Sequence, residues 1–163
     1  MDTTTYCCFT GHRTLREPEA VIQERLTEIL TDLIRQGYRH FCAGGALGFD
    51  TLAAKTVLEL KKTYEDIHLI LVLPFPDQYE KETGWSETDI AAYQDLKTKA
   101  LRVIHVMDSY CRGCYYRRNV ALVNCSSVCV AYQYKASGGT AYTTAYAAEK
   151  NVPVINCASQ RKT

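Results

Sequence analysis

Short apolar runs alternate along the chain with longer segments in which apolar residues recur every three or four positions. The run at residues 67–73, Ile-His-Leu-Ile-Leu-Val-Leu, is almost continuously apolar, which is typical of a strand covered on both faces. Pro74 and Pro76 end it. We expect six strands in all, at residues 6–9, 41–43, 67–73, 102–107, 128–132 and 152–156.

The segments between these runs have helical periodicity. The first helix is expected to begin at Pro18 and to end near Gly37. Ser86 and Asp89 resemble a capping box in which Asp replaces the usual Glu, and they predict a helix that continues through Leu96. Further helices are expected at residues 52–60, from within 110–119 to about 124, and at 140–150.

Strands that alternate with helices predict a parallel sheet with right-handed crossovers. The expected fold class is therefore α/β, a three-layer Rossmann-like parallel sheet flanked by helices. The 163 residues suit one domain, and no repeat or linker divides residues 1–163. Residues 77–86 are polar and aromatic, and we interpret them as an ordered flap.

Three glycine-bearing turns follow three of the expected strands and precede helices. They are Thr-Gly-His-Arg at 10–13, Gly-Gly-Ala-Leu-Gly-Phe-Asp at 44–50 and Ser-Gly-Gly-Thr at 137–140. Glycine lets backbone approach a ligand, and a helix N-terminus favours an anion. Because a parallel sheet places its strand-to-helix turns along one edge, the three turns should converge. They predict a pocket for a small nucleotide-type ligand that carries phosphate.

The second turn is the strongest element. Gly44, Gly45 and Gly48 would admit a phosphate or ribose. Asp50 would accept hydrogen bonds from ribose hydroxyls or act as a catalytic acid or base. The alternative is a tight turn in which Asp50 caps the next helix. Three glycines are more than a cap requires.

The first and third turns have the same two interpretations. Gly11, His12 and Arg13 follow a strand, and Arg13 would bind phosphate with two hydrogen bonds; the alternative is a solvated loop. Residues 137–140 would form a phosphate nest, or an ordinary Ser or Thr helix cap. The predicted ligand-binding residues here are Gly11, His12, Arg13, Ser137, Gly138, Gly139 and Thr140.

Further candidates lie between the second and third turns. Residues 115–119, Tyr-Tyr-Arg-Arg-Asn, place two cations and an amide on one helical turn, either at the ligand or on a solvated face. Tyr115 would stack on a base, and Tyr79 and Trp85 near the flap would close over it; ordinary packing is the alternative for these aromatics. The predicted binding residues here are Arg117, Arg118 and Asn119.

Charge and cysteine content narrow the partners. The formal net charge is +1, which gives no general attraction to nucleic acid or membrane. No apolar stretch reaches the ~20 residues that span a bilayer and no signal peptide is evident, so we expect a cytoplasmic protein. Most of the eight cysteines fall in strands, as buried apolar residues do. Cys111 and Cys114 form one C-x-x-C, which alone does not make a zinc site, and we expect no metal or other cofactor.

The order of these motifs resembles the SLOG superfamily, which groups the DprA/Smf proteins with the LOG phosphoribohydrolases. The segments at 73–78 and 113–119 are similar to the YpsA-type branch. The first of them adds Pro74 to the predicted ligand-binding residues. The resemblance implies a Rossmann-like fold, a pocket for a nucleotide or a molecule derived from one, and a homodimer. The segments that carry it are 9–13, 43–51, 73–78, 113–119, 137–140 and 145–149.

The sequence departs from the family pattern at two places. The LOG motif ends in a catalytic Glu, whose place is taken here by Ala145 or Thr143, depending on the alignment. Leu47 stands where the DprA pattern usually has Arg. A sensor or regulator that binds a nucleotide is therefore the first hypothesis. A nucleotide hydrolase using Asp50, with Glu82 or Glu87 as a second carboxylate, and a module for single-stranded nucleic acid are the alternatives.

Overall fold

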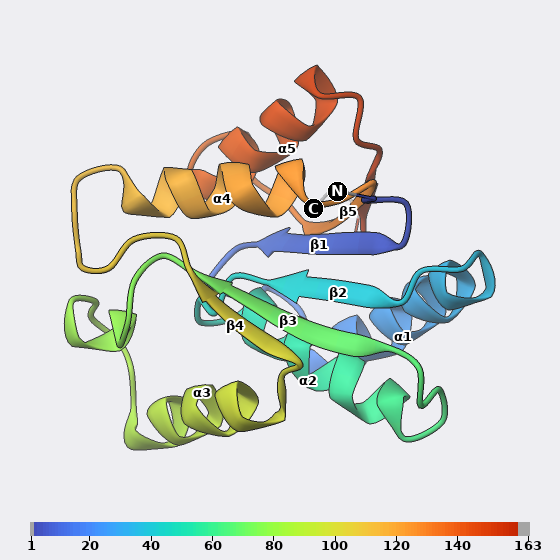
Figure 1. Ribbon diagram of the computed structural model, residues 1–163, viewed down its shortest axis with the longest axis horizontal. Helices are drawn as coiled ribbons and strands as arrows, with labels where there is room; N and C mark the ends of the chain where they lie inside the picture. The colour runs from blue at the N-terminus through green and yellow to red at the C-terminus, as the bar shows by residue number, and fades with distance from the viewer. Residues whose placement is uncertain (1, 160–163) are drawn as a thin grey trace.

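The computed structural model describes residues 2–159 as an α/β fold. Its six strands form one sheet, and its helices pack on both sides of that sheet (Figure 1). The elements are β1 Tyr6–Gly11, α1 Glu19–Arg35, β2 His40–Ala43, α2 Phe49–Lys61, β3 His68–Leu73, the 3-10 helix η1 Gln78–Glu80, α3 Glu87–Lys99, β4 Arg102–His105, α4 Cys114–Asn124, β5 Val128–Tyr132, α5 Gly139–Glu149 and β6 Val154–Asn156.

All strand pairs are parallel, and the strand order is β4-β3-β2-β1-β5-β6. The six predicted strands and the Rossmann-like parallel sheet are confirmed. The order moves outward in one direction from β1 to β4 and in the other from β5 to β6. In open parallel sheets such a reversal opens a crevice beyond the carboxyl ends of the two central strands, here β1 and β5.

The sheet has two different faces. Strand side chains alternate, so Cys7 and Phe9 of β1 pack with α1, α2 and α3, whereas Cys8 packs with α4 and α5. Figure 1 shows α1, α2 and α3 on one side and α4 and α5 on the other. The first face has the larger apolar core. The central strands are therefore covered on both sides, as the apolar run of β3 predicts.

Most helix boundaries agree with the sequence pattern to within a few residues. The capping box is confirmed: Asp89 N–H donates to Ser86 Oγ over 3.1 Å, and Ser86 N–H donates to Asp89 Oδ2 over 2.9 Å. One alternative was wrong. Asp50 does not cap α2, because that helix begins earlier, with Gly48 at the cap position and Asp50 inside the first turn.

Candidate functional site

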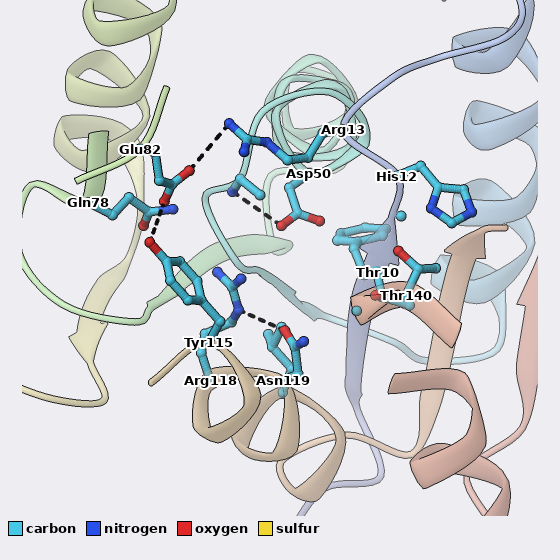
Figure 2. Close-up of a pocket in the computed structure, with 15 residues that line it drawn as sticks. Thr10, His12, Arg13, Asp50, Gln78, Glu82, Tyr115, Arg118, Asn119 and Thr140 are labelled. Carbon is cyan, nitrogen blue, oxygen red and sulfur yellow. Dashed lines mark hydrogen bonds and ion pairs between the residues drawn. The ribbon is translucent and has the colours of Figure 1, made fainter. Parts of the chain in front are cut away.

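A cavity of about 400 Å³ lies at the carboxyl end of β1, between the starts of α2, α4 and α5. This volume is within the range of small-molecule sites, and the position is the switch point of the sheet. Figure 2 shows the lining side chains. They are Phe9, Thr10, Gly11, His12, Arg13, Ala46, Asp50, Gln78, Glu82, Tyr115, Arg118, Asn119, Leu122, Gly139 and Thr140.

Asp50 is a buried carboxyl group at the wall of this cavity. Its side chain belongs to the first turn of α2 and is 6% exposed. Oδ2 accepts a hydrogen bond from Ala46 N–H over 3.2 Å, and Oδ1 has no partner among residues 2–159. Burial raises the pKa of Asp50 to about 6, although the positive charge of Arg118 opposes this shift. The group therefore changes protonation close to neutral pH.

Arg118 lies across Gly44 from Asp50. It is 6% exposed, its Nη1 donates to the carbonyl oxygen of Gly44, and its Nε donates to Asn119 Oδ1 over 2.8 Å. A Cβ atom on Gly44 would lie 2.9 Å from Arg118 Nη1 and 3.0 Å from Asp50 Oδ2. The absent side chain of Gly44 thus gives the guanidinium and the carboxyl group room beside the strand end.

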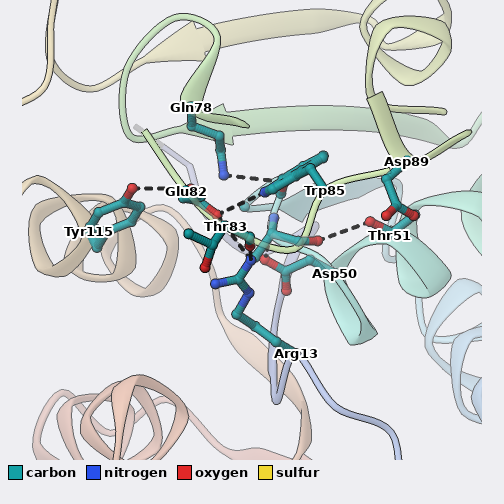
Figure 3. Close-up of polar contacts among 12 residues, drawn as sticks. Arg13, Asp50, Thr51, Gln78, Glu82, Thr83, Trp85, Asp89 and Tyr115 are labelled. Carbon is teal, nitrogen blue, oxygen red and sulfur yellow. Dashed lines mark hydrogen bonds and ion pairs between the residues drawn. The ribbon is translucent and has the colours of Figure 1, made fainter. Parts of the chain in front are cut away.

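Glu82 joins the flap to two other segments. Its carboxylate lies 3.4 Å from Arg13 Nη2, and it accepts hydrogen bonds from Tyr115 Oη at 3.1 Å and from Trp85 Nε1 at 3.2 Å. Arg13 also donates to the carbonyl oxygen of Thr83 over 3.2 Å. Figure 3 shows these contacts converging beside Asp50. The flap is therefore attached to the loop after β1 and to α4 by polar contacts around one carboxylate.

The start of α5 lacks a side-chain cap among residues 2–159. Gly138 is at the cap position, no side chain in this range accepts from the helix N–H groups, and the first turn has no acidic residue. Thr140 in this turn is 6% exposed, and Thr10 at the end of β1 is 7% exposed. Both side chains line the cavity, and within residues 2–159 neither hydroxyl has a hydrogen-bond partner. Neither oxygen belongs to the buried atoms that lack a partner, so both hydroxyls are accessible from the cavity.

Asn119 adds a donor to the same region. Its Oδ1 is occupied by Arg118, which leaves its Nδ2 hydrogens free of a partner in the described part of the chain. A Cβ atom placed on Gly139 would lie 3.8 Å from Asn119 Nδ2. The amide nitrogen, the two threonine hydroxyls and the first N–H groups of α5 are thus all donors on one side of the cavity.

His12 lines the cavity, but its ring forms hydrogen bonds with the backbone of the loop before α5. Its Nε2 accepts hydrogen bonds from the backbone N–H groups of Tyr134 at 3.2 Å and Lys135 at 3.3 Å. In Figure 2 the ring points away from Asp50. Partial burial, with the charges of Lys135 and Arg16, lowers the pKa of His12, so the neutral ring fits its acceptor role. The side chain holds the loop that leads to α5.

Several predicted site residues lie outside the cavity lining. Gly48 has φ of +79°, and a Cβ atom there would collide with the backbone carbonyl of Arg13, so this glycine permits the second turn to pack on the first. Arg117 is exposed and donates to Met107 Sδ over 3.5 Å, unlike its buried neighbour Arg118. The full set outside the lining is Gly44, Gly45, Gly48, Pro74, Tyr79, Trp85, Arg117, Ser137 and Gly138.

The three base-stacking candidates have separate environments. Tyr115 lines the cavity, with its hydroxyl on Glu82. Tyr79 and Trp85 instead contact each other and Tyr93, with ring centroids 5.5 to 5.9 Å apart. Those two rings belong to the flap itself and pack against the larger core.

Three polar residues of the cavity were absent from the predicted binding set. Thr10 could have been predicted from the sequence, because it is a hydroxyl residue in a strand whose other inward positions are apolar. Gln78 is fully buried and donates from Nε2 to the Gly45 carbonyl over 3.3 Å, and its Oε1 has no partner within residues 2–159. Glu82 is predicted from the sequence only as a second carboxylate for the hydrolase alternative. Its contacts with Arg13 and Tyr115 cannot be predicted without the fold.

Two further observations concern residues 2–159 only. No three His, Cys, Asp or Glu side chains in this part are arranged to hold a metal ion. Among the helices described, none is both long and apolar enough to cross a membrane.

The sheet order and the cavity define a class: a Rossmann-like α/β protein with a cavity at its switch point. Comparison with known proteins identifies the family. The family model named YpsA, described as the YspA SLOG family, matches residues 9–154, so the chain belongs to this family and the predicted resemblance is confirmed. Similar proteins include UPF0398 proteins of Brevibacillus brevis, 28% identical over 134 residues, and of Lactiplantibacillus plantarum, 36% identical over 76 residues. These matches cover 80% and 47% of this chain, and 70% and 39% of the two relatives.

Two solved structures of DNA processing protein A have a similar fold. The protein from Streptococcus pneumoniae superposes with a TM-score of 0.64 at 13% identity, and that from Helicobacter pylori with 0.65 at 17% identity. Both matches cover 93% of this chain, which spans 49% of the first protein and 64% of the second. The Helicobacter pylori protein is described as binding single-stranded DNA. At these sequence identities the comparison shows a shared fold and nothing beyond it.

Proposed function

We propose that this protein binds a small nucleotide or nucleotide-derived ligand in the switch-point cavity and acts as a sensor or regulator. The observation that carries the proposal is the pair of cavity-facing hydroxyls, Thr10 and Thr140, which have no partner among residues 2–159 and lie beside the uncapped start of α5. A helix N-terminus without an acidic residue favours an anion, and hydroxyl and N–H groups that face a cavity can donate to its oxygens. A phosphate supplies both the charge and the acceptors.

The two ends of such a ligand have different partners. The phosphate is expected at the start of α5, within reach of Thr10, Thr140 and the Asn119 amide. The free Oδ1 of Asp50 would accept hydrogen bonds from ribose hydroxyls. Tyr115 and the flap would then face the base. This orientation keeps the phosphate on the donor-rich side, away from the Asp50 and Glu82 carboxyl groups.

Calorimetric titration with AMP, ADP, ATP, ADP-ribose, NAD and cyclic nucleotides tests the binding. A Gly139→Asp variant tests the orientation, because the new carboxylate would occupy the phosphate position. Its φ is outside the positive range and the added Cβ meets nothing closer than 3.8 Å, so the variant should fold. We expect a loss of affinity of about 100-fold, since two or more charge-assisted hydrogen bonds are replaced by repulsion.

Ser137→Asp is the matched control. It adds the same charge two residues earlier, at an exposed position outside the cavity lining. Its affinity should stay within about threefold of the wild type, since exposed charges are well screened. Equal affinity in Gly139→Asp and Ser137→Asp would contradict the placement of the phosphate. No heat with any nucleotide at millimolar concentration would contradict the function itself.

A hydrolase that cleaves the N-glycosidic or phosphate bond of a nucleotide is a second candidate. One observation favours it: Asp50 has a pKa of about 6 and shares the cavity with the Glu82 carboxylate. A pair of carboxyl groups in different environments can divide acid and base roles. Chromatography of each titration mixture after long incubation distinguishes the two candidates, because a sensor returns its ligand unchanged.

The third candidate, binding of single-stranded nucleic acid, has less support. Such binding needs a basic track beside stacking aromatics. Of the two neighbouring arginines, Arg118 is buried and bound to Gly44, which leaves Arg117 as the exposed cation of the pair. A gel-shift experiment at low salt tests it directly.

A further inference from the structure

A row of thiols crosses the sheet beneath α4, away from the cavity. Cys8 of β1 pairs in register with Cys42 of β2 on one side and with Cys129 of β5 on the other. The three side chains belong to the smaller core and are at most 1% exposed. Cys125, at the C-terminal cap of α4, lies above this row and is partly exposed. One accessible thiol thus adjoins buried ones.

Cys125 and Cys42 are in contact. Their sulfur atoms lie 3.9 Å apart, so closing to a covalent bond of about 2 Å requires a shift of about 2 Å, shared between two side chains. Cys125 Sγ is also 3.2 Å from the carbonyl oxygen of Leu122 and 3.6 Å from Ser126 Oγ. We propose that Cys125 is a peroxide-reactive site and that Cys42 resolves the oxidised sulfur as an intramolecular disulfide.

The surroundings of Cys125 favour its reactive form. A hydrogen bond with the Cys42 thiol lowers the pKa of Cys125 to about 7; burial opposes this shift, and the Ser126 hydroxyl supports it. The pKa of Cys42 is raised well above its ordinary value, because it remains the protonated partner and is buried. The thiolate is the nucleophile in thiol oxidation, and exposure decides which thiol the oxidant reaches. Both properties select Cys125 for the first step and Cys42 for the second.

The chemistry balances with hydrogen peroxide as the oxidant. The Cys125 thiolate attacks one peroxide oxygen, the O–O bond breaks, and the departing hydroxide takes a proton to become water. The Cys125 sulfenic acid is then attacked by Cys42 sulfur. The S–S bond forms, the S–OH bond breaks, and the hydroxide leaves with the Cys42 proton as a second water. Two thiols are oxidised and one peroxide is reduced.

The disulfide would join residues 83 positions apart and fix the C-terminal end of α4 to β2. Because α4 also carries Tyr115, Arg118 and Asn119, the same bond would restrain one wall of the cavity. The proposal concerns thiol chemistry alone and stands whether or not the cavity binds a nucleotide.

The test is mass spectrometry of the reduced 163-residue chain after a small molar excess of hydrogen peroxide. We expect the intact mass to fall by about 2 Da, the mass of two hydrogens, and a thiol reductant to restore it. Without reduction, trypsin should release residues 40–55 linked to residues 119–135. The second peptide contains Cys125 and Cys129, so fragmentation of the linked pair locates the bond. The melting temperature should rise by roughly 5–15 °C on oxidation.

Single serine variants make the assignment specific. Cys125→Ser should abolish the linked peptides, whereas Cys129→Ser should retain them. Cys111→Ser is the matched control, because Cys111 is the other partly exposed thiol, and it should behave like wild type. A linked pair that persists in Cys125→Ser, or a wild-type protein that ends as a sulfinic acid or is oxidised at Cys111 alone, would overturn the proposal.

Discussion

Two aspartates of this protein lie in the first turn of a helix and have opposite properties. Asp89 in α3 is near the surface, where hydrogen bonds with Ser86 lower its pKa. Asp50 in α2 is buried at the cavity, and burial raises its pKa to about 6. The first carboxylate completes a helix cap, and the second is held ionised near neutral pH at a cost in folding free energy. Such a cost is typical of a functional group.

The starts of α3 and α5 differ in the same way. Ser86 accepts from an N–H group of α3 and closes that end within four residues. At α5 the hydroxyl of Thr140 faces the cavity, and within residues 2–159 it has no partner and no side chain caps the helix. A helix end satisfied by its own chain contributes to stability, whereas one left open at a cavity leaves its N–H groups to solvent or to a ligand. Four substitutions test this contrast.

Asp50→Asn should have the largest effect on stability. The folded pKa of Asp50 is above the ordinary 3.8, so its favourable contribution to folding is present below pH 3.8 and is lost as the pH rises through about 6. The neutral Asn avoids this loss and should raise the free energy of unfolding by about 3 kcal/mol above pH 6, from a shift of roughly two pKa units. Urea unfolding from about pH 5 to pH 8 measures it.

The same variant should bind nucleotide about tenfold more weakly, since a charged acceptor is lost. Higher stability with lower affinity would mark Asp50 as a functional group. If Asp50→Asn is less stable than the wild type at pH 8, the carboxylate is instead a structural partner of Arg118, and the contrast with Asp89 fails.

Ser86→Ala should come next and act on stability alone. Removing the side-chain acceptor leaves an N–H group of α3 unpaired and should lower the free energy of unfolding by about 1 kcal/mol. Ser86 lies outside the cavity lining, so ligand affinity should not change. Thermal unfolding with and without nucleotide separates the two quantities. A loss of affinity without a loss of stability would contradict the structural role of this cap.

Asp89→Asn should have a smaller effect with the pH dependence opposite to that of Asp50→Asn. The folded pKa of Asp89 is lowered, so its contribution is present above the ordinary value of 3.8 and is lost as the pH falls through the folded pKa. We expect a destabilisation of about 0.5 kcal/mol at neutral pH, where the charge interacts with the α3 dipole, and less in acid. The measurement is the same urea series. Identical pH profiles for the two variants would remove the distinction between the aspartates.

The sequence was informative wherever the deciding contacts are local. Ser86 and Asp89 are three residues apart, and they alone predict the cap of α3. The parallel sheet follows from the alternation of apolar runs and helical periodicity. The cavity depends on contacts between distant segments: Glu82 binds Arg13 and Tyr115, 69 and 33 residues away. The difference in burial between Arg117 and Arg118 could be predicted from the sequence. Arg118 is one helical turn before the buried Leu122 and therefore faces inward.

Thr140→Val should have the smallest effect on stability and so gives the sharpest contrast with Ser86→Ala. Both variants remove one hydroxyl from a helix start, but Thr140 Oγ1 has no hydrogen bond to lose among residues 2–159, and valine has nearly the same shape. The free energy of unfolding should change by less than about 0.5 kcal/mol, because no hydrogen bond within the protein is lost. Affinity for a phosphate-bearing nucleotide should fall about tenfold, while the corresponding nucleoside binds both proteins equally. Calorimetry with the AMP and adenosine pair measures this difference. A stability loss as large as that of Ser86→Ala would mean that Thr140 serves the helix rather than the cavity, and an equal loss of affinity for the nucleoside would place the phosphate elsewhere.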